Sequence, residues 1–194
     1  MRPSGATGRV FGWLMERMNA AVVAKVAALA ALPPGASSVE LGFGTGALVA
    51  ARAAQGDGLV AGVDPSPLML ATATRRTAAA IAVGRVDLRL GDASTLPWPQ
   101  SHFDAAFALH SWQFWADPAH DLAEVMRVLK PSGAIWFALR AHGSRPPDWL
   151  PNPISRSRDE AAGLLIALGA AGFGNGVVAA KVGSSVIVTA RAGG

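Results

Sequence analysis

The segment that decides the fold reads VELGFGTG at residues 39–46, an apolar strand that runs directly into a glycine-rich turn. A second apolar segment, residues 59–63, ends in Asp64. Glycines in such a turn let the backbone bend sharply and approach a ligand without a Cβ in the way. In a doubly wound parallel sheet, the acid at the end of the neighbouring strand binds ribose hydroxyls. The two segments together predict an α/β protein that holds a nucleoside.

The spacing of the glycines indicates which kind of nucleoside to expect. A dinucleotide site typically reads G-x-G-x-x-G, with a pyrophosphate at the helix N-terminus. Here Gly42, Gly44 and Gly46 follow the pattern G-x-G-x-G, and Glu40 lies two residues before the first of them. A carboxylate at that place would repel a pyrophosphate. It suits a ligand that carries positive charge, such as an α-ammonium or a sulfonium group.

Composition excludes several other classes of protein. The chain has 194 residues, enough for one domain with a core of its own, and 15% of them are charged, with a net charge of +4. It contains no cysteine, which excludes disulfides and thiolate metal ligands, and its four histidines are scattered. The basic residues are also spread along the sequence. We therefore expect neither a metal site nor a nucleic-acid partner.

Two stretches resemble membrane segments without meeting their requirements. Glu16, Arg17 and Lys25 interrupt the apolar N-terminal region, so no signal peptide is predicted. Residues 161–180 carry no charge and are long enough to span a bilayer. Glycines in the second half of that stretch predict a helix end followed by a turn instead. We expect a cytoplasmic protein with no membrane span.

Strands alternate with helices along the chain. Helical patterns cover residues 8–32, 46–56, 66–83, 117–129 and 158–171, and strand patterns cover residues 38–41, 59–63, 86–90, 104–109, 134–139, 177–181 and 184–189. Only Val182 and Gly183 separate the last two strands, so these two must pair as an antiparallel hairpin. The pattern predicts a doubly wound, mostly parallel seven-stranded sheet with an antiparallel C-terminal hairpin.

Five segments in this order resemble the motifs of class I S-adenosylmethionine-dependent methyltransferases. They are residues 39–46, Asp64, Gly91-Asp92-Ala93, Phe103-Asp104 and residues 127–133. The resemblance covers roughly residues 37–141 and is greatest to the small-molecule branch that includes the ubiquinone/menaquinone-biosynthesis type. It implies one Rossmann-like methyltransferase domain over residues 1–194, with residues 1–35 as a helical lid and residues 36–194 as the core.

The resemblance also implies where S-adenosylmethionine binds. Glu40 is expected to hold the methionyl ammonium group, Asp64 both ribose hydroxyls and Asp92 the adenine amino group. The other cofactor-binding positions are Gly42, Phe43 and Gly44 in the turn, Pro65 and Met69 against the adenine, Ala93 through its backbone N–H, and Ala108 and Leu109 along the methionyl part.

His110 directly follows the fourth predicted strand, so we expect it to face this site. Histidine is suited to take a proton near neutral pH, but positioning alone can supply much of the acceleration of a methyl transfer. His110 is therefore a candidate catalytic residue, with packing or contact with the cofactor as the alternative. Trp112, Phe114 and Trp115 either line an apolar acceptor pocket or pack this loop onto the next helix.

Four further residues have predicted roles in packing, in the lid or in acceptor recognition. We expect Trp98 to lie in the core and Asp104 to be structural, because Asp104 begins its strand at the edge away from the ligand. In the opening helix, Trp13 is expected to help close the lid over the cofactor. Trp149 lies in a Pro- and Gly-rich segment that is expected to recognise the acceptor.

The predicted activity is transfer of a methyl group to a small, partly apolar acceptor by in-line displacement, with S-adenosylhomocysteine as product. One alternative is a nucleoside-binding regulatory domain of the same fold without transfer activity. Another is an NAD(P)-dependent reductase, against which the glycine spacing, Glu40 and the terminal hairpin all argue. The sequence leaves the acceptor and the oligomeric state open, and the apolar hairpin is a candidate edge for pairing in a homodimer.

Overall fold

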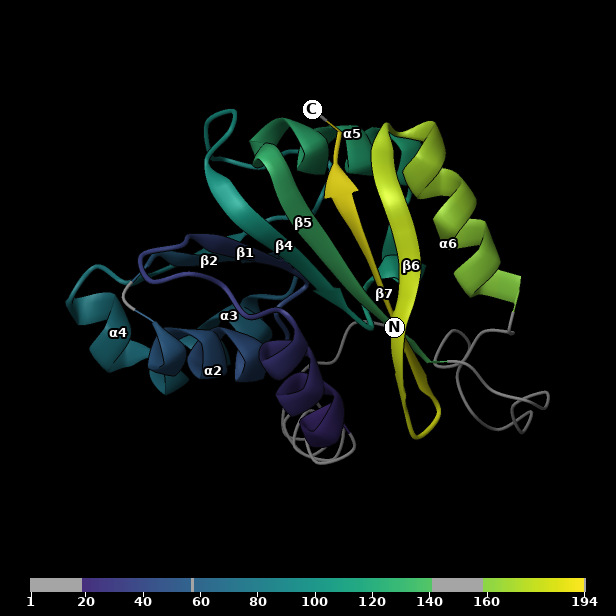
Figure 1. Cartoon of the computed structure of the whole chain (residues 1–194). Helices are drawn as coiled ribbons and strands as arrows, with labels where there is room; N and C mark the ends of the chain where they lie inside the picture. The colour runs from purple at the N-terminus through teal and green to yellow at the C-terminus, as the bar shows by residue number, and fades with distance from the viewer. Residues whose placement is uncertain (1–18, 57, 141–158, 194) are drawn as a thin grey trace.

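The computed structural model describes residues 19–56, 58–140 and 159–193, and a seven-stranded sheet lies at the centre of this part of the chain (Figure 1). The strands are β1 (Ser38–Leu41), β2 (Val60–Asp64), β3 (Val86–Leu90), β4 (Phe103–Leu109), β5 (Leu129–Arg140), β6 (Phe173–Val182) and β7 (Ser185–Ala192). Their order in the sheet is β3-β2-β1-β4-β5-β7-β6. Strands β1 to β5 pair in parallel, whereas β7 is antiparallel to β5 and β6. The predicted fold class, including the reversed hairpin, is confirmed.

Helices cover both faces of the sheet (Figure 1). They are α2 (Ala47–Gln55), α3 (Pro67–Arg76), α4 (Ala78–Ala82), the 3-10 turn η1 (Trp112–Phe114), α5 (Pro118–Val128), α6 (Asp159–Ala170) and a helix over residues 19–29. The helix at 19–29 packs with α2 around Val26 and Phe107 on one face, and α5 and α6 pack around Leu122 and Phe137 on the other. Within the described ranges, no helix combines the length and the apolar character that a membrane crossing needs.

Two of the predicted helix starts have the expected caps. The Ser66 side chain accepts a hydrogen bond from the Met69 N–H at 3.4 Å, and Pro67 is the first residue of α3. Asp117 accepts from the His120 N–H at 3.2 Å at the start of α5. Such caps satisfy N–H groups that have no partner inside the helix, which is why the helices begin at these residues.

The predicted helix over residues 66–83 is wrong in one respect, because it is divided into α3 and α4 at Thr77. The Thr77 hydroxyl donates to the Ala73 carbonyl at 2.9 Å, and its backbone leaves the helical region with φ −105° and ψ 16°. Threonine side chains that bond to the backbone in this way compete with regular helix. The opening helix ends at residue 29 rather than 32, and residues 1–18, with Trp13, lie outside the described chain.

The tail also differs from its predicted boundaries. The turn expected near residues 174–176 belongs to β6, whose pairing with β7 shifts register between Gly174 and Val177. The hairpin turn consists of Gly183 and Ser184, one residue later than predicted, and Gly183 has the positive φ of +55° that favours glycine. Strand β6 lies at the edge of the sheet, which is where the predicted pairing of the hairpin in a homodimer would need it to be.

Two residues predicted to be structural are so. Trp98 is 6% exposed, and its indole N–H donates to Asp87 at 3.0 Å. Asp104, near the start of β4, forms an ion pair with Lys130 at 2.8 Å and accepts from the Ser37 N–H at 2.8 Å. Trp149 lies outside the described residues.

Candidate cofactor-binding site

The structure brings the predicted site residues to one edge of the sheet, because four adjacent strands end there side by side. The Gly42 N–H donates to the Val63 carbonyl at 2.8 Å, which joins the turn after β1 to the end of β2. The Gly91 N–H donates to the Asp64 carbonyl at 3.2 Å, which joins the end of β2 to the loop after β3. The carboxyl edge of a parallel sheet is where such folds bind ligands.

Asp64 holds the glycine turn to the next helix. Its carboxylate is buried, and its two oxygens accept from the backbone N–H groups of Gly44 at 2.8 Å and Ser66 at 2.9 Å. Burial raises the pKa of the Asp64 carboxyl above its ordinary value, and the two N–H groups oppose that rise. A carboxylate offers about four acceptor positions, so two remain for the hydroxyls of a ligand.

Glu40 is the most unusual group at this edge. It is only 5% exposed, and its Oε2 atom has no hydrogen-bond partner among the described residues. Burial holds the pKa of the Glu40 carboxyl well above its ordinary value, the nearby charge of Asp64 raises it further, and the Val49 N–H of α2 opposes both effects. A buried carboxylate that lacks a partner costs folding free energy unless a cation or a donor compensates it.

The three glycines of the turn serve different purposes. All have positive φ: +80° at Gly42, +52° at Gly44 and +75° at Gly46. A Cβ added at Gly42 would lie 2.6 Å from the Ser111 Cβ, and one added at Gly46 would lie 2.7 Å from the Ala73 Cβ. No described atom lies within 4 Å of a Cβ added at Gly44. Gly42 and Gly46 are therefore needed for packing, whereas Gly44 leaves its backbone open to a ligand.

The positions expected to surround the adenine fall into two groups. Met69 is 9% exposed and packs with the buried Phe43 in a core cluster between the sheet, α2 and α3. Pro65 and Asp92 are exposed, and Asp92 Oδ1 accepts from the backbone N–H of Ser94 at 3.1 Å and from its hydroxyl at 2.6 Å. Phe43 can thus meet a ligand only through its backbone, while Asp92 presents its side chain at the surface.

The segment after β4 is tied to its neighbours on both sides. The His110 N–H donates to the Ala138 carbonyl of β5 at 2.8 Å, and the His110 carbonyl accepts from the Gln113 side chain at 2.8 Å. His110 has φ +55°, a conformation that histidine tolerates better than most residues. The buried Ser111 hydroxyl donates to the Leu41 carbonyl at 2.5 Å. Ser111 was not predicted as part of the site, because its only signal in the sequence is a small polar residue shortly after a strand end.

The aromatic residues that follow are mainly structural. Trp112 and Trp115 are partly buried and pack against Phe137 of β5 with ring centroids 5.5 and 5.8 Å away. Phe114 is 64% exposed and stays a candidate for acceptor contact. Of the two positions expected along the methionyl part, Ala108 is fully buried and Leu109 is half-buried.

Glu40→Gln is expected to raise the free energy of unfolding near neutral pH by about 1 kcal/mol, or about 2–4 °C in melting temperature. The pKa of Glu40 is higher in the folded than in the unfolded chain. Stability is therefore lost as the pH rises from the ordinary glutamate range through the raised pKa, and a neutral amide avoids this loss. Thermal denaturation of both proteins over a pH series measures the difference, which should vanish near about pH 4.

Glu124→Gln is the matched control for this substitution. Glu124 pairs with Arg127 at 2.7 Å, and that side chain lowers the pKa of the Glu124 carboxyl. Loss of the charge should therefore destabilise the protein near neutral pH, the opposite sign. A stabilisation by Glu40→Gln that is equal at every pH would show that the buried charge is not its cause.

Comparisons with known proteins agree with this arrangement. Residues 39–137 match the family model of a methyltransferase domain. A demethylmenaquinone methyltransferase from Symbiobacterium thermophilum is 39% identical over 102 residues, which are 52% of this chain and 41% of that protein. The chain spans less than half of the length of the first curated relatives that it matches, between 31% and 44%.

Solved structures extend the likeness beyond the matched segment. A SAM-dependent methyltransferase from Aquifex aeolicus superposes with a TM-score of 0.71 at 20% identity, over 91% of this chain and 92% of that one. A [4+2]-cyclase superposes with a TM-score of 0.71 at 24% identity, over 89% and 80% of the two chains. At these identities the likeness shows the fold alone. Because the family model covers half of the sequence and the whole glycine turn, the chain belongs to the methyltransferase domain family, of the class I S-adenosylmethionine-dependent type.

Proposed function

We propose that this chain binds S-adenosylmethionine at the carboxyl edge of its sheet and transfers the methyl group to a small, partly apolar acceptor. The observation that carries the proposal is the buried Glu40 carboxyl, whose Oε2 atom has no partner among the described residues. An ammonium group placed there would supply both the missing charge and the missing donor. Asp64 lies on the neighbouring strand β2, two residues beyond Gly62, which pairs with Glu40, and it keeps acceptor capacity for two hydroxyls.

The remaining contacts follow the order of the strands. Asp92, exposed after β3, is proposed to accept from the adenine amino group. The other proposed contacts are the backbone from Gly42 through Gly44, the exposed ring of Pro65 with Met69 behind it, the N–H of Ala93, and Ala108 with Leu109 beside the methionyl chain. Met69 lies in the first turn of α3, and the other positions lie at the ends of β1, β2, β3 and β4 or within three residues after them.

The bound cofactor would supply a methyl group on a sulfonium. The acceptor nucleophile would bond to that carbon while the S–CH3 electron pair stays on sulfur, which gives S-adenosylhomocysteine as the product. The chain itself has to align the acceptor and remove its proton. His110 directly follows β4. Its N–H donates to the Ala138 carbonyl and its carbonyl accepts from the Gln113 side chain, and these two hydrogen bonds set its position. Imidazole is the side chain best suited to take that proton near neutral pH.

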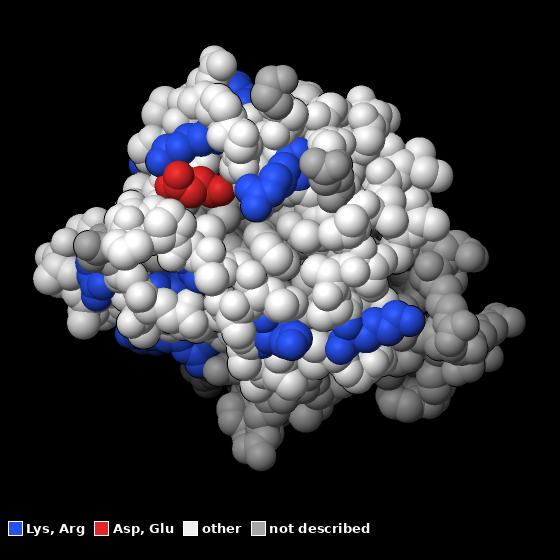
Figure 2. Space-filling view, in the orientation of Figure 1, with Lys and Arg blue, Asp and Glu red and all other residues white. Residues whose placement is uncertain are grey.

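A small acceptor agrees with two further observations. Lys and Arg side chains lie apart from one another on the face in Figure 2, rather than along one groove that would follow a nucleic-acid backbone. The Symbiobacterium relative is named a demethylmenaquinone methyltransferase, which gives a quinone as the acceptor of that protein. Small hydroquinones and phenols are therefore the first acceptors to test.

His110→Asn is expected to lower kcat about 100-fold while the affinity for S-adenosylhomocysteine stays unchanged. Asparagine tolerates the positive φ at this position, so the fold should be retained. The measurement is transfer of a labelled methyl group to a panel of hydroquinones and phenols, with a pH profile for each protein. Unchanged kcat would assign His110 to packing or to cofactor contact.

A nucleoside-binding domain without transfer activity is the second candidate, because a structure of the same fold is named as a [4+2]-cyclase and the fold alone therefore does not entail methyl transfer. The two candidates make different predictions for the same preparation. A methyltransferase forms S-adenosylhomocysteine in proportion to a methylated acceptor. Tight binding of the cofactor with no turnover across the panel would favour the binding domain.

A further inference from the structure

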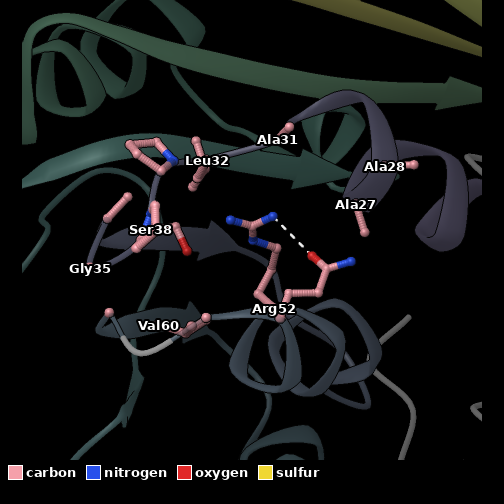
Figure 3. A pocket seen from close by; sticks show the side chains of 14 residues that line it. Ala27, Ala28, Ala31, Leu32, Gly35, Ser38, Arg52 and Val60 are labelled. Atoms are coloured by element: carbon pink, nitrogen blue, oxygen red, sulfur yellow. Dashed lines mark hydrogen bonds between the residues drawn. The ribbon is translucent and has the colours of Figure 1, made fainter.

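A pocket of about 540 Å³ lies at the opposite, amino edge of the sheet. Its walls come from the end of the helix at 19–29 and the loop that follows, from the last turn of α2, and from the starts of β1 and β2 (Figure 3). Ser38 and Val60, which line it, are the first residues of their strands, whereas Asp64 is the last residue of β2. This pocket is therefore separate from the proposed cofactor site. Its volume is within the range of about 300–1,000 Å³ typical of small-molecule sites.

The guanidinium of Arg52 projects into the middle of this pocket (Figure 3). Its Nη1 atom donates to the Ala30 carbonyl at 3.2 Å and to the Gln55 side chain at 3.0 Å. Its Nε atom is buried without a hydrogen-bond partner in the part of the chain that the structure describes. The edge formed by Nε and Nη2 is the one through which a guanidinium binds a carboxylate with two parallel hydrogen bonds.

The charge of Arg52 is only partly compensated. The guanidinium carbon lies 5.8 Å from the centroid of the Phe107 ring, a contact that stabilises a cation weakly. No carboxylate among the described residues forms an ion pair with it. Burial lowers the pKa of Arg52, although an arginine stays protonated at any physiological pH. A half-buried guanidinium that no described carboxylate pairs with is a candidate site for an anionic ligand.

The other walls define the rest of the ligand. Ala27, Ala31 and Leu32 give one side of the pocket an apolar surface, and among the described lining residues Arg52 is the single cation. One guanidinium matches one negative charge. We propose that this pocket is a second ligand site, which binds a small monocarboxylate with an apolar body through Arg52. The proposal does not depend on methyl transfer.

Phenylacetate is a suitable probe, with phenylacetamide as a neutral control of the same shape. Titration followed by two-dimensional NMR of backbone amides should give saturable shifts at Gly35, Gly56 and Gly58, which line the pocket. Gly44 and Asp64, at the other edge, should not shift. Phenylacetamide should bind at least ten times more weakly than phenylacetate. Inorganic phosphate tests whether charge alone is sufficient, and tighter binding of phosphate than of phenylacetate would overturn the assignment to an apolar carboxylate.

Three variants make the test specific. Arg52→Gln, which removes the charge, should weaken phenylacetate binding at least tenfold. Ala31→Trp fills the pocket without altering Arg52 and should abolish binding, so it serves if Arg52→Gln fails to fold. Arg75→Gln removes an exposed arginine of α3, whose side chain donates to the Thr72 hydroxyl at 3.4 Å, and should change nothing.

Two results would overturn the proposal. One is a set of shifts that do not saturate or that persist unchanged in both Arg52→Gln and Ala31→Trp. The other is a set of shifts at Gly44 and Asp64 in place of the pocket glycines. Binding of S-adenosylhomocysteine should be the same in all three variants, so failure of this proposal and failure of the proposed function can be told apart.

Discussion

Asp64→Ala is expected to lower the affinity for S-adenosylmethionine and S-adenosylhomocysteine by at least about 100-fold. Two ribose hydroxyls lose a charged acceptor, and hydrogen bonds to charged groups contribute about 1.5–3 kcal/mol each. The Gly44 N–H also loses the carboxylate that it contacts at 2.8 Å, so the turn becomes less well ordered. Calorimetric titration of both ligands measures the loss, with circular dichroism to establish that the variant is folded.

Asp104→Asn is the matched control for Asp64→Ala. Asp104 is also a partly buried aspartate at a strand terminus, but it lies at the amino edge and pairs with Lys130 at 2.8 Å. Its removal should cost stability and leave the affinity for both ligands unchanged. Retention of affinity within about threefold by a folded Asp64→Ala variant would place the ribose elsewhere.

Gly42→Ala is expected to reduce the free energy of unfolding by about 3 kcal/mol, or about 6–12 °C in melting temperature. The new Cβ would lie 2.6 Å from the Ser111 Cβ, and the backbone at φ +80° is one that alanine adopts only at a cost. Ser111 is held by its bond to the Leu41 carbonyl, so it cannot move aside without losing that bond. Urea denaturation measures the difference.

Two further variants separate the clash from the backbone strain. Ser111→Gly in the Gly42→Ala background removes the clashing Cβ and should recover part of the lost stability. The backbone at Gly44 also has a positive φ, but no described atom lies within 4 Å of a Cβ added there. Gly44→Ala should therefore lower the free energy of unfolding by only about 1 kcal/mol. It should nevertheless weaken cofactor binding, because that Cβ would face the ligand. Equal destabilisation by Gly42→Ala and Gly44→Ala would contradict this division of roles.

The sequence predicts most of the fold because its signals are local. An apolar run before a glycine turn, a Ser-Pro pair and an Asp-Pro pair each specify an element within a few residues. The antiparallel tail also follows locally, since two residues cannot make a parallel crossover. The break at Thr77 was not predicted, because a threonine hydroxyl can either bond to the carbonyl four residues before it or point to solvent, and the sequence does not indicate which.

The site is predictable in position but not in energetics. Strand ends locate Glu40, Asp64 and Asp92, yet the sequence cannot indicate that the Glu40 carboxyl is covered by α2 and that its Oε2 atom has no hydrogen-bond partner among the described residues. The contact between Gly42 and Ser111 joins positions far apart in the chain and has no local pattern. The Arg52 pocket is hidden for the same reason, since two stretches that lie apart in the sequence, residues 27–38 and 52–60, form its walls.

We propose that the glycine turn and its two buried acids hold an adenosyl amino acid and not a dinucleotide. Calorimetric titration of the native chain with S-adenosylhomocysteine, beside an identical titration with NADH, distinguishes the two ligands. We predict one site per chain with micromolar affinity for S-adenosylhomocysteine and no heat of binding for NADH. A folded chain that gives no heat with S-adenosylhomocysteine, or that binds NADH more tightly, would contradict the assignment of this edge as a methyl-donor site.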